Sequence, residues 1–170
     1  MEYWDAYDQW GRPTGGLLVR GEPVPAGCYH IVVAAVVEHA DGDFLLMKRH
    51  PGKQTHPGKW EAGASGSVLA GEGIEEAALR ELQEETGLVA SEIKPLYEVT
   101  AGDCLFRGFL CRGNWPKHSV QLQEGETVDY RWVSREELAR IDRIEDGQVI
   151  LHAGLLHYLG LPDGKKGTEG

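Results

Sequence analysis

The chain has 170 residues, of which 41% are hydrophobic and 26% charged, and its formal net charge is -10 with an isoelectric point near 5.1. These values are typical of a globular protein with one buried core, so we expect a single domain over residues 1–170. The acidic balance argues against nucleic acids and anionic membranes as the main partners, because both recruit basic patches. An anionic ligand would therefore require a metal ion or a local basic pocket.

The cysteines and the N-terminus bear on the compartment. Cys28, Cys104 and Cys111 show neither paired metal-ligand spacing nor the density of a disulfide scaffold, which indicates free thiols in a reducing compartment. The opening MEYWDAYDQW is acidic and aromatic, and no apolar run approaches the roughly 20 residues that span a bilayer. We therefore expect a cytoplasmic protein that is neither exported nor inserted in a membrane.

The first 60 residues predict strands and one long loop. The stretch WDAYDQWGRPTG reads as a short extended segment and a Gly/Pro turn. Residues 30–38 are β-branched and almost continuously apolar, as in a strand buried on both faces. Residues 43–50 follow the turn signal Asp41-Gly42, so the two segments predict a hairpin. The loop 50–60 carries two Pro-Gly pairs and two lysines, and basic loops of this kind often contact ligands.

A helical period begins at Gly73. Ile74, Ala78 and Leu82 recur every four residues, and Gly87 follows as a C-terminal stop signal. This pattern predicts an amphipathic helix of roughly three to four turns.

The remaining sequence predicts three more strands and two helices. IKPLYEVT and CLFRGFLCR read as strands joined around residues 101–103, and Thr127–Val133 alternates like a strand. Ser134, with Glu137 three residues later, forms a capping-box signal for a helix. A last helix is expected over residues 148–159, and residues 162–170 are expected to be a flexible tail.

The predicted helix of the Gly73 region carries a cluster of carboxylates. Glu81, Glu84 and Glu85 stand at i, i+3 and i+4, so they fall within one sector of about 100°. Such a cluster must raise a pKa, find cations or bind a divalent metal, and oxygen ligands favour Mg²⁺ or Mn²⁺ over zinc. A solvated acidic face is the alternative.

The spacing of the residues around this cluster favours a metal site over a solvated acidic face. Gly66 is followed by Glu72, then by Arg80-Glu81-Leu82, Glu84-Glu85 and Gly87-Leu88. This arrangement matches the Nudix box, Gly-x5-Glu-x7-Arg-Glu-aliphatic-x-Glu-Glu-x-Gly-aliphatic, at every defined position. The chain therefore resembles the Nudix hydrolase superfamily.

The resemblance implies a fold and a mechanism. The fold is of the α/β (α+β) class: an α/β/α sandwich with a mixed β-sheet and a loop-helix-loop catalytic element. The activity is hydrolysis of a diphosphate linkage by a metal-activated water, with Mg²⁺ or Mn²⁺ as cofactor. The family pattern assigns metal ligation to the Gly66 carbonyl and to the carboxylates of Glu81, Glu84 and Glu85.

Other residues of the pattern have supporting roles. The resemblance implies that Arg80 orients the acidic side chains and that Glu72 supports the loop. Nudix proteins often place a further ligand or base on a loop before a later strand, where this chain has Glu124 and Glu126. An exposed turn is the alternative and fits Glu124 better, so Glu126 is the candidate for catalysis and metal binding. Which acid takes the proton stays open.

Weaker matches outside the box are similar to the isopentenyl-diphosphate isomerase-like branch of the superfamily. They are YDQWGRPTG, the spacing Gly27-x-x-His30, the segment LLMKRHPGKQTHPGKW and the pair Glu124-Gly-Glu126. In that branch an N-terminal extension, here residues 1–29, packs on the domain, and basic loop residues contact a diphosphate. This implies substrate-binding roles for Arg49, Lys53 and Lys59, with solvated loop cations as the alternative.

Isomerisation itself is disfavoured by the residues on either side of Gly66, the first glycine of the Nudix box. True isomerases protonate an alkene with a cysteine and hold a metal with several histidines, whereas this chain has Ser65 and Ser67 at the corresponding positions. His30 is the one histidine of that set that remains, and a lone histidine at the start of a strand is more often structural. The intact box then favours hydrolysis.

We therefore expect a hydrolase of a small nucleoside or organic diphosphate. Isomerase activity and a non-catalytic diphosphate-metabolite sensor are the alternatives, although such sensors tend to lose box carboxylates or to carry a DNA-binding domain. Trp60, Trp115 and Trp132 either stack a base or are buried. The substrate and the oligomeric state stay open; relatives are often dimers, so a homodimer is an alternative to a monomer.

Overall fold

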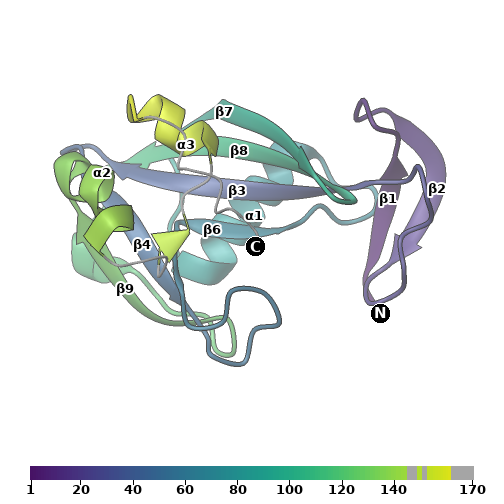
Figure 1. The fold of residues 1–170 in the computed structure, drawn as a ribbon. Coiled ribbons are helices and arrows are strands. Elements are labelled where there is room, and N and C mark those ends of the chain that lie inside the picture. Colours follow the sequence, from purple (N-terminus) through teal and green to yellow (C-terminus); the bar gives the residue numbers. More distant parts are fainter. Residues whose placement is uncertain (145–148, 151–152, 162–170) are drawn as a thin grey trace.

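A computed structural model describes residues 1–144, 149–150 and 153–161, which form a mixed α+β fold (Figure 1). The strands are β1 (Tyr3–Tyr7), β2 (Pro13–Val19), β3 (His30–His39), β4 (Phe44–Arg49), β5 (Trp60–Ala62), β6 (Ala64–Ser67), β7 (Glu92–Ala101), β8 (Cys104–Gly113), β9 (Thr127–Val133) and β10 (Val149–Ile150). The helices are α1 (Ile74–Thr86), α2 (Arg135–Ile144), α3 (Ala153–Tyr158) and the short 3₁₀ helix η1 (Lys117–Ser119).

Strand β3 is the centre of the main sheet. It pairs in parallel with β8 along its whole length, and β7 follows β8 as an antiparallel neighbour. On its other edge, β6 pairs with residues 32–35 and β4 meets it at Glu38. Strand β4 then continues to β5 and β9, so the sheet curls away from β3. The predicted hairpin of β3 and β4 is confirmed, as are the strands β7, β8 and β9.

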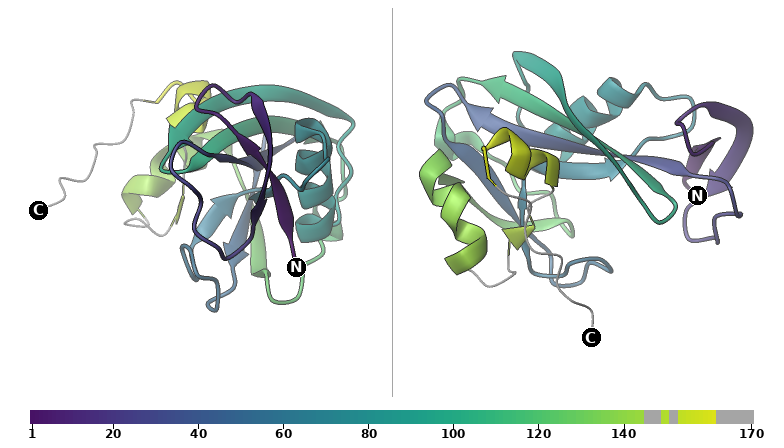
Figure 2. Two further views of the ribbon diagram at one scale, coloured as in Figure 1. Left: turned by 90° about the vertical axis from the view of Figure 1, so that its right-hand side faces the viewer. Right: turned by 45° about the horizontal axis from the view of Figure 1, so that its top comes forward.

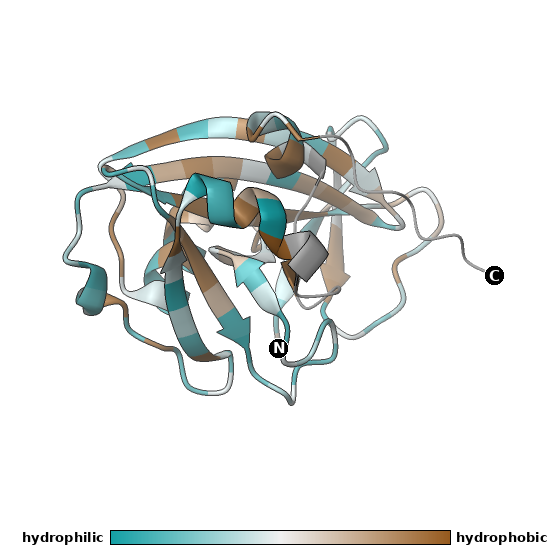
Figure 3. Cartoon of the chain, turned by 60° about the vertical axis from the view of Figure 1, so that its left-hand side comes forward, coloured by the Kyte–Doolittle hydropathy of each residue, from teal (hydrophilic) through white to brown (hydrophobic). Residues whose placement is uncertain are grey.

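Helices cover the curled sheet on both faces, which makes the predicted α/β/α sandwich. The alternation of β4 separates the two cores, because Leu45 and Met47 belong to the core on the α1 side and Phe44 and Leu46 to the other. The α1 side is filled by Ala77, Ala78 and Leu82, and the opposite side by Leu138, Ile141 and Leu155. Apolar and polar residues alternate along several of the strands (Figure 3).

Helix α1 has the limits that the sequence predicts. At its start, the Glu76 carboxylate accepts the Gly73 N–H at 3.3 Å. At its end, Gly87 adopts a left-handed conformation with φ of 72° and donates its N–H to the Gln83 carbonyl. The helix therefore begins directly after one glycine and ends before another.

The N-terminal segment forms more than the predicted extended stretch. Strands β1 and β2 make a separate two-stranded sheet at one end of the molecule, distant from α2 and α3 (Figures 1 and 2). Hydrogen bonds from Ala70 N–H to the Tyr3 carbonyl and from Gly71 N–H to Asp5 Oδ2 join β1 to the loop before α1. A buried cluster of Trp4, Ala6 and Leu18 packs beneath them.

The C-terminal prediction is partly wrong. The helix expected over residues 148–159 is shorter, because α3 begins only at Ala153, while Val149 and Ile150 pair in parallel with β5. Their β-branched side chains suit a strand, and β5 has an edge that accepts one. The residues 145–148, 151–152 and 162–170, and with them the expected tail, lie outside the described residues. In α2, Ser134 Oγ accepts the Glu137 N–H, as the capping signal predicts.

None of the helices in the described part of the chain combines the length and the apolar character that crossing a membrane requires.

Candidate active site

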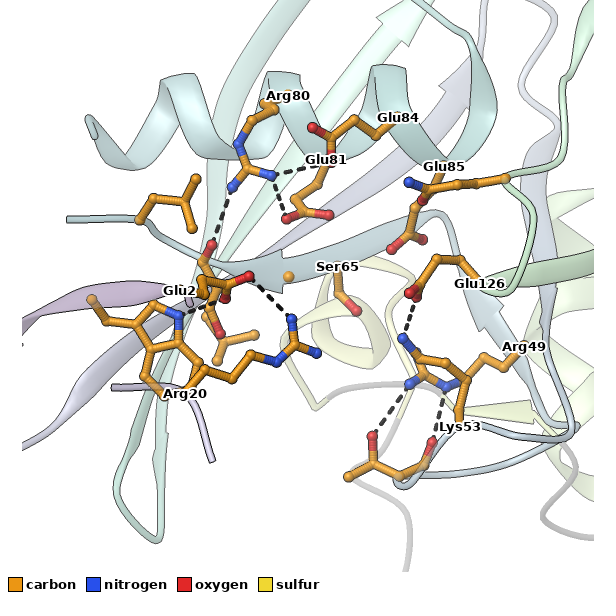
Figure 4. A pocket seen from close by; sticks show the side chains of 17 residues that line it. Glu2, Arg20, Arg49, Lys53, Ser65, Arg80, Glu81, Glu84, Glu85 and Glu126 are labelled. Carbon is orange, nitrogen blue, oxygen red and sulfur yellow. Dashed lines mark hydrogen bonds and ion pairs between the residues drawn. The ribbon is translucent and has the colours of Figure 1, made fainter. Parts of the chain in front are cut away.

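The acidic face of α1 borders a cavity of about 520 Å³ (Figure 4). Strand β6 contributes to it next to α1, while the N-terminal hairpin, the loop after β4 and the loop before β9 supply further side chains. The charged groups that line it are Glu2, Arg20, Arg49, Lys53, Arg80, Glu81, Glu84, Glu85 and Glu126. The cavity thus unites segments that are more than 100 residues apart in the sequence.

The Glu81 carboxylate lies against the Cα atom of Gly66, so a side chain at this position would displace it. A Cβ atom at Gly66 would come within 2.1 Å of Glu81 Oε1 and within 2.2 Å of its Cδ. Gly66 is held in place by the pairing of β6 with β3, where it faces Val33. The backbone of Gly66 and the carboxylate of Glu81 therefore border the cavity side by side, in line with the box pattern.

Arg80 connects the acidic residues of the box. Its guanidinium donates two hydrogen bonds to Glu72, at 2.6 and 3.0 Å, and one each to Glu81 and Glu84. It also donates to the Ser67 carbonyl at 3.1 Å. Burial would raise the pKa of Glu72, but hydrogen bonds from Arg80 and from a backbone N–H outweigh it, so the pKa is lowered. Glu72 is therefore an ionised anchor for Arg80, which positions the Glu81 carboxylate.

Glu85 is the most strongly perturbed acid of the cavity. Only 6% of the residue is exposed, and burial followed by the charges of Glu61, Glu81 and Glu126 raises its pKa to about 9, with Lys53 opposing. Burial also raises the pKa of Glu81, against the effect of its arginine partner. Carboxylates held together in a buried place require protons or cations to offset their charge.

The donor set of the cavity fits a hard divalent cation. The Gly66 backbone and the carboxylates of Glu81, Glu84, Glu85 and Glu126 offer oxygen ligands, which Mg²⁺ and Mn²⁺ prefer. No histidine or cysteine is among the described residues that line the cavity, so it lacks the nitrogen and sulfur donors that zinc favours. Glu124 is exposed and does not line the cavity.

Two of the three predicted basic residues border the cavity. Arg49 and Lys53 line it, whereas Lys59 is not among the lining residues. The Arg49 guanidinium donates to Glu61 Oε2 at 2.8 Å and to the carbonyl and hydroxyl of Thr55. Lys53 forms an ion pair with Glu126. Both cations thus lie opposite α1, and each already has a carboxylate partner.

The N-terminal hairpin contributes residues that the sequence did not indicate. Trp4, Glu2 and Arg20 line the cavity. Trp4 Nε1 donates to Glu2 Oε1 at 2.8 Å, and Arg20 Nη1 donates to Glu2 Oε2 at 3.1 Å. No local pattern marks these residues, since the sequence places them more than 40 positions before the box. The sequence analysis also did not identify Glu61 as a partner of the site residues. The available signal was a charged residue within a short, mostly apolar strand, which is unusual.

The tryptophans that were candidates for base stacking lie elsewhere. Trp115 and Trp132 stack on each other with ring centres 6.4 Å apart, and the Arg131 guanidinium lies 4.8 Å from the Trp60 ring centre. None of the three is among the cavity-lining residues of the described chain, where Trp4 is the tryptophan present. The contacts of the three tryptophans therefore support a structural role, packed against other side chains, and not the stacking of a substrate base.

The side chains next to Gly66 also bear on the chemistry. Ser65 and Ser67 both line the cavity, and Ser65 lies between α1 and the basic residues (Figure 4). The three cysteines are free, and none lines the cavity in the described chain. The described lining therefore offers the hydroxyl groups of these two serines and no thiol.

Comparisons with known proteins find Nudix hydrolases and isopentenyl-diphosphate isomerases among the relatives of this chain. An uncharacterized Nudix hydrolase of Listeria monocytogenes is 32% identical over 142 residues, covering 81% of this chain and 83% of the relative. An isopentenyl-diphosphate Delta-isomerase of Klebsiella pneumoniae is 27% identical over 136 residues, covering 76% of this chain and 74% of that protein.

Solved structures share the fold. The crystal structure of DR0079 from Deinococcus radiodurans has a TM-score of 0.72 at 21% identity, covering 94% of this chain and 98% of that one. The Nudix domain of Shewanella oneidensis NrtR, solved with ADP ribose, has a TM-score of 0.56 at 21% identity, covering 74% of this chain and 88% of that one. The sequence profile of the NUDIX domain matches residues 29–153. The chain belongs to the Nudix family, with hydrolases and isopentenyl-diphosphate isomerases among its relatives.

Proposed function

We propose that this protein hydrolyses a diphosphate linkage in a small nucleoside or organic diphosphate with the help of Mg²⁺ or Mn²⁺. The observation that carries the proposal is that carboxylates of one helix and cations from other segments face each other across a single cavity. Glu81, Glu84 and Glu85 lie along α1, and Arg20, Arg49 and Lys53 lie across from them (Figure 4). A cation held by the acidic side and a phosphate held by the basic side would complement each other.

A metal at this site would supply positive charge to the diphosphate oxygens and lower the pKa of an attacking water. The chain supplies the rest. Arg80, fixed by Glu72, holds Glu81 and Glu84 in place. Arg49 presents a planar guanidinium suited to phosphate oxygens, oriented by its bond to Glu61. One of the carboxylates accepts the proton of the water.

Lys53 and Glu126 are proposed to exchange partners. They form an ion pair between the loop after β4 and the loop before β9. A cation bound by Glu126 would compete with Lys53 for the carboxylate and leave the ammonium group available for a phosphate. The same pair thus accounts for the proposed metal role of Glu126 and the substrate role of Lys53.

Isomerase activity is less well supported, although isomerases are among the relatives. The mechanism requires an acid that protonates an alkene, and Ser65 and Ser67 are much weaker acids than a cysteine thiol. Prenyl diphosphates nevertheless remain in the substrate class as compounds to be hydrolysed.

A phosphate-release screen tests the proposal. Nucleoside diphosphates, nucleotide sugars, dinucleotides and prenyl diphosphates would be incubated with the protein in Mg²⁺, in Mn²⁺ or in a chelator, with phosphomonoesters developed by an added phosphatase. Isopentenyl diphosphate would also be followed for its allylic isomer. We expect turnover of at least one diphosphate that the chelator abolishes.

The variants sharpen the result. Glu84→Gln or Glu85→Gln should lower turnover by several orders of magnitude, whereas Glu75→Gln, on an exposed part of the same helix outside the cavity, should retain it. Near-normal rates in either cavity variant would contradict the assignment. Tight metabolite binding in calorimetry without turnover in Mg²⁺ would support the sensor instead, and formation of the allylic isomer would support the isomerase.

A further inference from the structure

A second group of metal-ligating side chains lies outside the cavity, where β3 begins and β8 leaves its turn. It consists of His30, Asp103 and Cys104, whose donor atoms all lie within 4.8 Å of one another. Cys104 Sγ is 3.1 Å from His30 Nε2 and 3.5 Å from Asp103 Oδ1. His30 is buried, Cys104 is half-buried and Asp103 is exposed. None of the three belongs to the acidic face of α1.

We propose that His30, Asp103 and Cys104 form a binding site for Zn²⁺ that is separate from the site on α1. Zinc takes thiolate sulfur at about 2.3 Å and imidazole nitrogen or carboxylate oxygen at about 2.0–2.2 Å. In a tetrahedral arrangement these bond lengths put neighbouring donor atoms about 3.3–3.6 Å apart. The sulfur distances in the cluster are close to these values, so small rotations of the side chains would complete the three-sided arrangement.

The donor types distinguish this site from the cavity. A thiolate and an imidazole select zinc, whereas the carboxylates of α1 select Mg²⁺ or Mn²⁺. Burial raises the pKa of Cys104 to about 11, with Asp103 adding to the effect, so the thiol is protonated in the metal-free protein. When zinc binds, a bond forms between zinc and sulfur, and the thiol proton leaves to solvent. Burial lowers the pKa of His30, so the imidazole is already in the neutral form that ligates metals.

Two features define how tightly the metal is held. The three protein donors leave the fourth tetrahedral position for water, and the exposed Asp103 provides access from solvent. His30 Nδ1 is buried and has no hydrogen-bond partner among the described residues. Metal-ligating histidines usually donate from the second nitrogen, and loss of such a partner costs 10- to 100-fold in affinity. We therefore expect an exchangeable zinc rather than one that survives chelation.

The site is connected to the active-site cavity through Trp4. The rings of Trp4 and His30 stack with centres 4.2 Å apart and planes 9° apart, which holds the His30 ring against the cysteine. Trp4 also lines the cavity and donates to Glu2, which pairs with Arg20. Zinc would fix His30, and with it the wall of the cavity that the N-terminal hairpin provides.

Cobalt is the probe that tests the proposal independently of catalysis. The full-length protein would be freed of metal with a chelator, kept reduced with a phosphine and titrated with Co²⁺. We expect a thiolate-to-cobalt charge-transfer band in the near ultraviolet that saturates as Co²⁺ is added and is abolished by added Zn²⁺. Oxygen-ligated cobalt at the α1 carboxylates has no such band, so the signal is specific to a cysteine ligand.

Variants identify the ligands. Cys104→Ser should lose the band, while Cys28→Ser, which alters a half-buried thiol outside the cluster, should keep it. Asp103→Asn changes an exposed side chain and should weaken cobalt binding at least tenfold with the fold intact, as checked by circular dichroism. Absence of the band in the unaltered protein, or its persistence in Cys104→Ser, would overturn the zinc site, and neither outcome depends on whether the protein hydrolyses diphosphates.

Discussion

Replacing Glu85 with glutamine should make the metal-free protein more stable at alkaline pH and remove its response to Mg²⁺. Glu85 is 6% exposed, and its pKa in the folded state is raised to about 9 by burial and by the neighbouring acids, Glu61 first. The ordinary value for a glutamate, 4.5, applies to the unfolded chain. Between these values the folded protein keeps a proton that the unfolded chain has released.

The sign and size of the effect follow from this difference. Because the folded state binds more protons, its free energy of unfolding falls as the pH rises, by about 1.4 kcal/mol per pH unit for one group. Between about pH 6 and pH 8, Glu85 alone should therefore cost the metal-free protein about 3 kcal/mol. Glutamine has nearly the same shape and does not titrate, so the variant should lack this part of the slope.

The assay is urea unfolding of the metal-free protein and of Glu85→Gln at several pH values, with and without Mg²⁺. In the unaltered protein Mg²⁺ should restore stability at pH 8, because a bound cation favours the ionised carboxylate. Glu75→Gln, which changes an exposed residue of the same helix, should behave like the parent. Equal pH slopes in the parent and in Glu85→Gln, or equal stabilisation of both by Mg²⁺, would refute the reasoning.

Three further substitutions follow from the contacts. Gly66→Ala should lower turnover at least a hundredfold while the protein stays folded, because the added Cβ would meet the Glu81 carboxylate at 2.1 Å. Steady-state kinetics measure the turnover and circular dichroism checks the fold, and unchanged turnover would contradict the prediction. Arg20→Gln should raise KM about tenfold with little change in kcat. The control is Arg12→Gln, which should leave KM unchanged. Arg12 is an exposed arginine of the same hairpin that is also paired with a carboxylate but does not line the cavity. Leu82→Ala should lower the free energy of unfolding by about 2–5 kcal/mol in urea titrations, because the leucine is fully buried. A loss below about 1 kcal/mol would contradict this and show that the core closes over the space left by the leucine side chain.

Much of the fold was predictable because local signals agreed with the tertiary structure. The apolar period and the flanking glycines set the limits of α1, and the continuous apolar run of β3 indicated a strand buried on both faces. The prediction for the last helix failed in part because the apolar residues at its expected start suit a strand as well as a helix. Val149 and Ile150 pair with the edge of β5, and no local pattern reports that a distant edge is available.

The sequence by itself determined that Glu81, Glu84 and Glu85 share one face of α1, because the box is a local motif whose spacing sets which side chains share one helical sector. It also indicated that Ser65 and Ser67 replace the groups isomerisation would need. Only the tertiary structure decided what faces that helix. Glu2 and Arg20 approach the box through the packing of the N-terminal hairpin, and Cys104 approaches His30 through the pairing of β8 with β3. These contacts depend on how sheets and loops pack over long sequence distances, which residue spacing does not encode.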